Sequence, residues 1–256
     1  MDIAIDRFAP VVLGDGAAVL FRGDILHILP ALEAGTVDHV VTDPPYSSGG
    51  QSRGVRMAST SQKYIVTNKK GSKYPDFLGD NRDQRGYTYW FTLWASLCYR
   101  LLRPGGLFLS FTDWRQFPAT SDAIQAAGFI WRGAVAWDKT EGSRPDKGRF
   151  RHQAEYLLWG SHGPHRPGPN APCLPGVYRH PVRAVDKHHM AGKPTALMAD
   201  LLRITGPGDL ILDPFMGSGT TGVAAGQAGR RFIGIELSDD IFATAVERIG
   251  AAIAQR

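Results

Sequence analysis

The chain has 256 residues, of which 43% are hydrophobic and 21% are charged, a composition ordinary for a globular protein with one full core. No apolar run approaches the ~18 residues that a membrane span needs, and the acidic beginning of the chain lacks a secretory signal pattern, so we expect neither a membrane protein nor an exported one. The two cysteines, Cys98 and Cys173, lack the spacing of metal ligands, so we expect no metal and a reduced, cytoplasmic setting.

Strands and helices are predicted to alternate along the chain. Residues 37–41 form an apolar run that ends in Thr-Asp-Pro-Pro, the pattern of a buried strand stopped by proline. This order predicts one α/β domain over residues 1–256, with a mostly parallel sheet covered by helices on both faces. Further strands are predicted at 107–111, 129–137, 156–159, 210–212 and 231–235, and helices at 87–102, at 115–127, from about 220 and after a capping Ser238.

Two segments interrupt this alternation: a basic loop at 47–80 and a proline-rich stretch at 160–189. The net charge is +5, and residues 47–75 hold six basic side chains and no acidic one. Residues 160–189 contain six prolines, and loops this long inside a compact domain are usually functional. Basic loops that flank one site favour a polyanionic partner. The side chains expected to contact it are Arg53, Arg56, Lys63, Lys69, Lys70, Lys73, Arg151, Arg166, Arg179 and Arg183.

A glycine-rich turn, Asp213-Pro-Phe-Met-Gly-Ser-Gly-Thr-Thr-Gly222, joins the strand at 210–212 to the next helix. Glycines there let the backbone approach a ligand, and free N–H groups at the helix start suit a carboxylate or a phosphate. Glu236 ends the following strand nineteen residues after Gly217, where a carboxylate can accept both hydroxyls of a ribose. The turn and Glu236 together predict a nucleoside cofactor.

The same turn also fits the fingerprint of a nicotinamide-dinucleotide fold, from Gly217 to Gly222. Two features argue against a dehydrogenase. The turn lies close to the carboxyl end of the chain, whereas dinucleotide folds usually open with it. Asp213, directly before the turn, would repel a pyrophosphate but is a natural partner for the amino group of a methionine moiety.

Asp43-Pro44-Pro45-Tyr46 follows the strand at 37–41, where an open α/β sheet places its active site. The exocyclic amine of a nucleobase is a poor nucleophile because its lone pair is delocalised into the ring. The Asp43 carboxylate and the Pro44 carbonyl can accept its two N–H groups, and the prolines hold these acceptors in place. Tyr46 offers a flat face for a base swung out of the duplex. A sulfonium methyl is already a strong electrophile, so in-line alignment matters more than a strong base.

These motifs resemble the amino-group DNA methyltransferases of the β type. In that family the Asp-Pro-Pro-Tyr element precedes the Phe-x-Gly-x-Gly element, as Asp43 to Tyr46 here precede Phe215 to Gly219. Gly23-Asp24, Lys193-Pro194 and the strand end at Trp137-Asp138-Lys139 extend the resemblance over nearly the whole chain. It implies a Rossmann-like fold, dependent on S-adenosylmethionine and with permuted motif order. It further implies methyl transfer from that cofactor to N6 of a flipped adenine in double-stranded DNA.

The resemblance also implies roles for single residues. Asp43, Pro44, Pro45 and Tyr46 would hold the target amine, and the stretch from Arg151 to Glu155 would line the base pocket. Lys193 would lie near the carboxylate of the cofactor. The other residues expected around S-adenosylmethionine are Asp24, Asp213, Phe215, Gly217, Ser218, Gly219, Thr220, Thr221 and Glu236.

One departure from the family concerns the reading of the DNA sequence. The target-recognition region usually lies between the pocket strand and the Lys-Pro helix, and here only the short segment 160–189 is available. Either few base pairs are read, or the loop at 47–80 and a second subunit assist. A homodimer is therefore one expectation, and strong sequence selectivity is not.

Three other functions compete with adenine methylation of DNA. Methyltransferases that act on RNA or on a protein glutamine more often carry Asn in place of Asp43 and place the glycine turn first. N4-cytosine methyltransferases commonly carry Ser at that position, so Asp43 favours adenine. A DNA-binding module without catalysis would leave both Asp43 to Tyr46 and the Asp213 turn unexplained.

Overall fold

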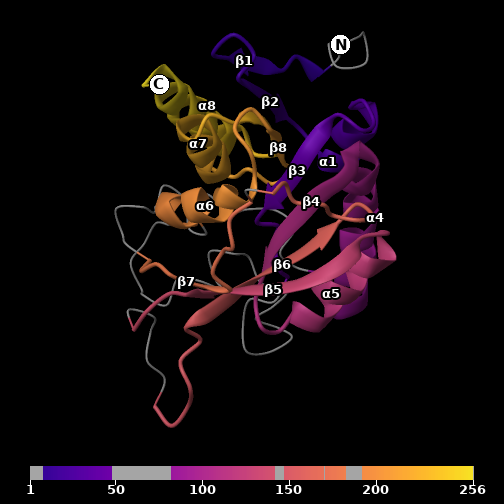
Figure 1. Cartoon of the computed structure of the whole chain (residues 1–256), viewed down its shortest axis with the longest axis vertical. Helices are drawn as coiled ribbons and strands as arrows, with labels where there is room; N and C mark the ends of the chain where they lie inside the picture. The colour runs from indigo at the N-terminus through magenta and orange to yellow at the C-terminus, as the bar shows by residue number, and fades with distance from the viewer. Residues whose placement is uncertain (1–7, 48–81, 142–146, 170, 183–191, 256) are drawn as a thin grey trace.

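The computed structural model describes residues 8–47, 82–141, 147–169, 171–182 and 192–255. Strands from these ranges form one nine-stranded sheet in the order β1-β2-β9-β8-β3-β4-β6-β5-β7 (Figure 1). Five of the eight neighbouring pairs run parallel, which confirms the mostly parallel sheet predicted from the sequence. The strands are β1 (Val11–Leu13), β2 (Ala18–Arg22), β3 (Val37–Thr42), β4 (Leu102–Thr112), β5 (Ile130–Asp138), β6 (Ala154–Ser161), β7 (Val177–Arg179), β8 (Leu210–Asp213) and β9 (Arg231–Glu236).

Helices cover both faces of the sheet, as expected (Figure 1). One face packs against α1 (Ile25–Ile28), α4 (Gln84–Leu101) and α5 (Phe117–Ala126), around a buried cluster that contains Phe91, Trp94 and Phe108. The other face packs against α6 (Thr195–Leu201), α7 (Thr220–Gln227) and α8 (Asp239–Ala254), around a cluster with Leu109 and Phe232. Two 3-10 turns, η2 (Leu29–Ala31) and η4 (Leu202–Ile204), complete the described elements.

The predicted elements are present, and the differences lie mainly at their ends. The helix expected at 87–102 begins at its N-cap Asp83, whose carboxylate accepts the Gly86 N–H at 2.7 Å. It ends at Leu101 and leads directly into β4, which begins five residues earlier than the strand predicted at 107–111. Ser238 holds the N-cap position of α8, but its side chain makes no capping hydrogen bond, contrary to the prediction. Two acidic residues in the first turn of α8 suit the positive end of the helix instead.

Six described elements were not predicted: β1, β2, α1, β7 and the two 3-10 turns η2 and η4. The strand β7 corrects the expectation that the proline-rich segment is a loop throughout, because Val177–Arg179 pairs with the carboxyl end of β5. Three residues are too few to show a strand period, so its pairing partner decides the conformation. The basic loop at 47–80 lies outside the described residues apart from Ser47, and so do Arg53, Arg56, Lys63, Lys69, Lys70, Lys73 and Arg183.

The carboxyl ends of β2, β9, β8, β3 and β4 lie at one edge of the sheet, because these five strands are mutually parallel. From β3 the chain leads to β4 by way of α4 on one face, and from β8 it leads to β9 by way of α7 on the other face. The neighbours β3 and β8 therefore flank a topological switch point. Open α/β sheets bind their ligands in the crevice outside the strand ends at such a point.

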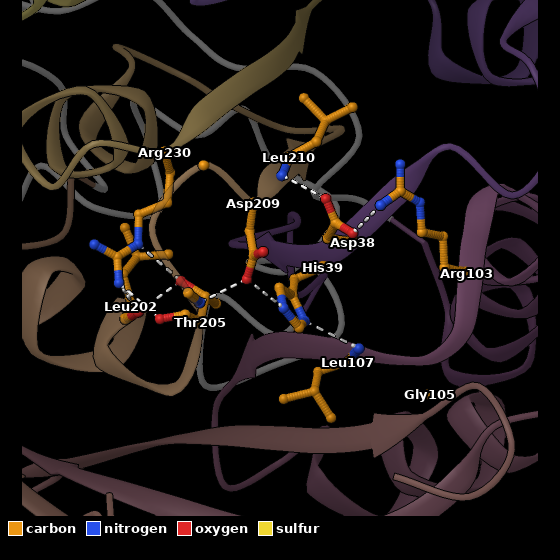
Figure 2. A network of polar contacts seen from close by, with 12 residues as sticks. Asp38, His39, Arg103, Gly105, Leu107, Leu202, Thr205, Asp209, Leu210 and Arg230 are labelled. Carbon is orange, nitrogen blue, oxygen red and sulfur yellow. Dashed lines mark hydrogen bonds and ion pairs between the residues drawn. The ribbon is translucent and has the colours of Figure 1, made fainter. Parts of the chain in front are cut away.

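A polar network ties β3, β4 and β8 together at the opposite edge (Figure 2). Asp38 accepts hydrogen bonds from Arg103 Nη1 at 2.7 Å and from the Leu210 N–H at 2.8 Å. His39 Nδ1 accepts the Leu107 N–H at 3.2 Å, so the proton resides on Nε2, which lies 3.1 Å from Asp209 Oδ2. Burial lowers the pKa of His39 in spite of the raising influence of Asp209, which keeps the ring neutral in the fold.

This network predicts a loss of stability in acid. A histidine whose folded pKa lies below its unfolded value of ~6.5 takes up a proton more readily in the unfolded chain, so the free energy of unfolding falls as pH drops below that value. His39→Gln should reduce this slope between about pH 5 and pH 7 in denaturant titrations. His27→Gln, at an exposed position on α1, is the matched control and should keep the wild-type slope. An unchanged slope in His39→Gln would show that another group carries the effect.

Candidate active site

Asp43 follows directly after β3 at the switch point, and both of its carboxylate oxygens are hydrogen-bonded. The Tyr46 hydroxyl donates to Oδ1 at 2.7 Å, and Lys193 Nζ donates to Oδ2 at 2.5 Å. Pro44 and Pro45 lie between Asp43 and Tyr46 in the chain and restrict the backbone that joins them. A target amine must therefore replace one of these donors or share an oxygen with it.

Lys193 lies immediately before α6 with only 8% of its side chain exposed. Its ammonium is 3.4 Å from Glu155 Oε2 as well as bonded to Asp43, and Lys139 Nζ donates to Glu155 Oε1 at 3.1 Å. The rings of Tyr46, Phe111 and Trp137 lie within 5.9 Å of Lys193 Nζ. The site thus contains two carboxylates, two ammonium groups and an aromatic wall.

The pKa values of Asp43, Glu155 and Lys193 shift in different directions because each side chain has different charged neighbours. Burial raises the pKa of Asp43, with Lys193 opposing and Glu155 adding to the rise. Burial would also raise the pKa of Glu155, but Lys193 and Lys139 outweigh it and hold that pKa below its usual value. Burial would lower the pKa of Lys193, but the two carboxylates outweigh it, so this side chain stays an ammonium. The pKa of Asp43 is thus shifted towards the protonated form and that of Glu155 towards the charged form.

Asp213 ends β8 next to Asp43 and is almost completely buried, with 2% exposed. Its Oδ1 accepts the Thr42 hydroxyl at 2.7 Å and the Phe215 N–H at 3.0 Å, and its Oδ2 accepts the Thr221 hydroxyl at 2.6 Å. Burial raises the pKa of Asp213 to about 6, although these three hydrogen bonds act to lower it. Because Thr42 is the last residue of β3, its hydroxyl joins the Asp43 strand directly to the glycine turn.

The glycine turn requires two residues without side chains. Gly217 has a φ of +51° and Gly219 a φ of +84°, and a Cβ atom on Gly219 would lie 2.9 Å from Ile249 Cδ1. Gly219 is the N-cap of α7, so Thr220 and Thr221 open that helix. The ring of Phe215 contacts Trp90 and Trp94 at centroid distances of 5.4 and 5.0 Å, which fixes the side of the turn facing α4.

Glu236 ends β9, and Asp24 follows the end of the neighbouring strand β2 by two residues, since Arg22 of β2 pairs with Glu236. The Glu236 carboxylate accepts backbone N–H groups from Ser238, at 2.9 Å, and from Leu237 and Gly217, while burial raises its pKa. A carboxylate offers about four lone-pair sites, so capacity remains for a ribose hydroxyl. Asp24 Oδ1 accepts the Leu26 N–H at 2.8 Å as the N-cap of α1, and its second oxygen has no hydrogen bond among the described residues.

The structure brings most of the expected site residues to one edge of the sheet. The Asp-Pro-Pro-Tyr element, the glycine turn, Glu236 and Asp24 follow the parallel strand ends, and Lys193 joins them. Lys193 contacts Asp43 and not the glycine turn, so its place at a cofactor carboxylate stays a prediction. Lys139 and Thr42 were not expected to belong to the site; both stand at strand ends, which is the sequence signal that could have indicated them.

The three expected DNA-contacting residues that the structure describes, Arg151, Arg166 and Arg179, divide between the two edges. Arg151 precedes β6 and Arg179 ends β7, and both ends lie at the edge that carries Asp43. Arg179 is exposed and lies 3.5 Å from Asp138. Arg166 follows β6 at the other edge, near Gly105, and is not brought to the site.

No group of three or more His, Cys, Asp or Glu side chains among the described residues is arranged to hold a metal ion. None of the helices described is both long enough and apolar enough to cross a membrane.

The sheet has parallel central strands, with a glycine turn and an Asp-Pro-Pro-Tyr element at its topological switch point. This combination is typical of methyltransferases that act on nucleic acids. The sequence profile of the DNA methylase family N6_N4_Mtase matches residues 37–181 and 172–247. The chain belongs to this DNA methylase family, as the sequence motifs predicted.

Named relatives agree with this assignment. YubD of Escherichia coli (strain K12) is 30% identical over 231 residues, which cover 90% of this chain and 89% of YubD. The type II methyltransferase M2.DpnII of Streptococcus pneumoniae is 28% identical over 254 residues, covering 91% and 90% of the two chains.

The solved structures that resemble the chain show its fold. The complex of M1.HpyAVI with SAM has a TM-score of 0.65 at 24% identity, covering 91% of this chain and 98% of that one. The cytosine-N4-specific PvuII DNA methyltransferase has a TM-score of 0.70 at 18% identity, covering 96% and 94%. The Rossmann-like methyltransferase fold expected from the sequence is thereby confirmed.

Proposed function

We propose that the chain transfers the methyl group of S-adenosylmethionine to the exocyclic N6 of a flipped adenine in double-stranded DNA. One observation carries this proposal: Asp43 and the Asp213 turn lie on neighbouring strand ends, joined by the 2.7 Å hydrogen bond from Thr42 to Asp213. An acceptor for an amine and a turn suited to a nucleoside cofactor thus open into the same crevice. Methyl transfer requires such proximity, because donor and acceptor must align before reaction.

The residues of the turn fit S-adenosylmethionine. Apart from its chain neighbours, nothing among the described residues lies within 4 Å of the position that a Cβ atom would take on Gly217. The backbone there is open to close approach, and the N–H groups at the start of α7 suit a carboxylate. Buried Asp213 gives the turn a negative charge above about pH 6, which suits the amino group of the methionine moiety. Glu236 and Asp24 stand at the next strand ends for the ribose and the adenine ring. When bound, the cofactor supplies an electrophilic sulfonium methyl.

Asp43 acts on the target base in this proposal. Its carboxylate accepts an N–H of the amine in place of the Tyr46 hydroxyl, while Lys193 stays bonded to the other oxygen. This contact directs the lone pair of the nitrogen towards the methyl group. The N–CH3 bond forms as the S–CH3 bond breaks, and the amine then releases one proton. Asp43 is the nearby acceptor for that proton, since burial raises its pKa. Tyr46 provides a ring face for stacking of the flipped base.

N4 of cytosine is the second candidate, and the fold shared with the cytosine-N4-specific PvuII enzyme favours it. Asp43 supports adenine, since Ser is common at this position in cytosine enzymes. DNA from a methylase-deficient host that expresses the protein should contain N6-methyladenine after digestion and mass analysis. N4-methylcytosine in that DNA would show the base to be wrong, and unmodified DNA from a host with folded protein would contradict the proposal.

Arg151 and Arg179 are the described residues that we propose as DNA contacts, because they lie at the catalytic edge. A contact to phosphate releases counterions, so Arg179→Ala should reduce the salt slope of log affinity by about one unit. Arg166→Ala, at the opposite edge, removes the same charge. It is the matched control for the effect of net charge on DNA affinity without a direct contact. Fluorescence anisotropy of a labelled duplex at several salt concentrations measures both slopes. Equal slopes in the two variants would contradict a direct contact at Arg179.

A further inference from the structure

We propose that Lys193 is a positioning residue for methyl transfer: its buried ammonium holds the Asp43 carboxylate charged and oriented towards the crevice, and separates it from Glu155. This role rests on the proposed function, because it serves the same carboxylate. It differs from the cofactor contact expected for Lys193 from the sequence. The two roles predict different measurements.

The contacts of Lys193 carry the proposal. Its Nζ lies 2.5 Å from Asp43 Oδ2 and 3.4 Å from Glu155 Oε2, and the side chain is 8% exposed. Three aromatic rings within 5.9 Å complete its surroundings. An ammonium is costly to bury unless it is paired, so both carboxylates are needed to hold it there. The same pairing fixes the positions of the carboxylates.

The charges around Asp43 show why an ammonium is needed. Glu155, from β6, lies close enough to share Lys193 with Asp43, and two carboxylates at this distance disfavour each other's charged form. Asp213, from β8, adds a further negative charge beside Asp43. The Tyr46 hydroxyl bonds to Asp43 at 2.7 Å, but it brings no positive charge. Lys193 is therefore the cation that opposes this repulsion at Asp43.

Lys139 is the internal comparison. It carries the same charge and is similarly enclosed, but its 3.1 Å contact is to Glu155. The negative charge of Asp113, which follows β4, contributes to the raised pKa of the Tyr46 hydroxyl. Lys139→Gln therefore removes one ammonium from the network and leaves the contact between Lys193 and Asp43 intact.

The test measures kcat/KM for methyl transfer to duplex DNA across pH in wild type, Lys193→Gln, Lys193→Met, Lys193→Arg and Lys139→Gln. Without the ammonium, Asp43 is protonated more easily, so the decrease of kcat/KM on the acidic side of the pH profile should begin at a higher pH. The ratio of kcat/KM at about pH 8.5 to that at about pH 6 should rise about tenfold in the neutral variants. Lys193→Arg keeps the charge and should restore the ratio towards wild type, and Lys139→Gln, which acts on Asp43 only through Glu155, should move the ratio less than the neutral Lys193 variants do.

Each alternative gives a different result. Equal loss at every pH in Lys193→Gln and Lys193→Met, with folding confirmed by circular dichroism, would overturn the proposal in favour of packing alone. Weaker S-adenosylmethionine binding by calorimetry, together with an unchanged pH dependence of kcat/KM, would overturn the proposal and assign Lys193 to the cofactor. A shift in Lys139→Gln as large as in Lys193→Gln would also overturn it. If wild type itself transfers no methyl group to DNA, the proposed function fails first.

Discussion

Asp43→Ala is expected to reduce kcat for methyl transfer about a hundredfold or more, the scale for removing one charged acceptor in a transition state. The variant deletes both oxygens that now bind Tyr46 and Lys193, so an amine at the crevice loses its charged partner. S-adenosylmethionine binding should persist, because the cofactor turn is built by Asp213 and the residues after it. Transfer of a radiolabelled methyl group to duplex DNA measures the loss, and calorimetry measures the binding.

Asp43→Asn is the matched control for this change. It keeps the size of the side chain and one acceptor oxygen but removes the charge, so it separates shape from charge. It should fall well below wild type, since the neutral amide cannot take the proton that the amine releases. Wild-type turnover in the alanine variant would rule out Asp43 as the acceptor at the target amine.

Glu236→Ala is expected to weaken S-adenosylmethionine binding about tenfold or more. A hydrogen bond to a charged group contributes about 1.5–3 kcal/mol, and 1.4 kcal/mol corresponds to tenfold in affinity. The carboxylate also accepts N–H groups from Gly217 and Ser238, so its loss loosens the glycine turn from β9. Isothermal titration calorimetry on protein with unchanged circular dichroism measures the effect.

Asp240→Ala provides the control for Glu236. Asp240 is an exposed acidic residue in the first turn of α8, four positions further along, and its removal changes the net charge equally. Its affinity for S-adenosylmethionine should match wild type. A folded Glu236→Ala protein that binds as tightly as Asp240→Ala would contradict the assignment of Glu236 to the ribose.

The two motifs of the candidate site could be predicted from the sequence because each is a short stretch with strict local demands. Gly217 and Gly219 adopt backbone angles that other residues rarely take, and Asp43 stands at a strand end marked by prolines. The strand before Asp43 and the strands that end at Asp213 and Glu236 carry apolar runs that are easily recognised. Parallel strands then bring their ends to one edge without further information.

The contacts of Lys193, Glu155 and Lys139 could not be predicted in the same way. They depend on the antiparallel strand β6, whose first residues reach the catalytic edge only because β6 pairs with both β4 and β5. No short stretch of sequence encodes that pairing. The strand β7 was missed for the same reason, since three residues of a proline-rich segment are held by β5.

Incubation of the purified protein with S-adenosylmethionine that carries a trideuterated methyl group tests the central claim most directly. The substrate is unmethylated duplex DNA, and the DNA is then digested to nucleosides for mass spectrometry, with Asp43→Ala treated in parallel. We expect trideuterated N6-methyladenine from wild type and at most a trace from the variant. The label on N4 of cytosine would contradict the choice of base. DNA without label, from protein that calorimetry shows to bind S-adenosylmethionine, would contradict methyl transfer to DNA itself.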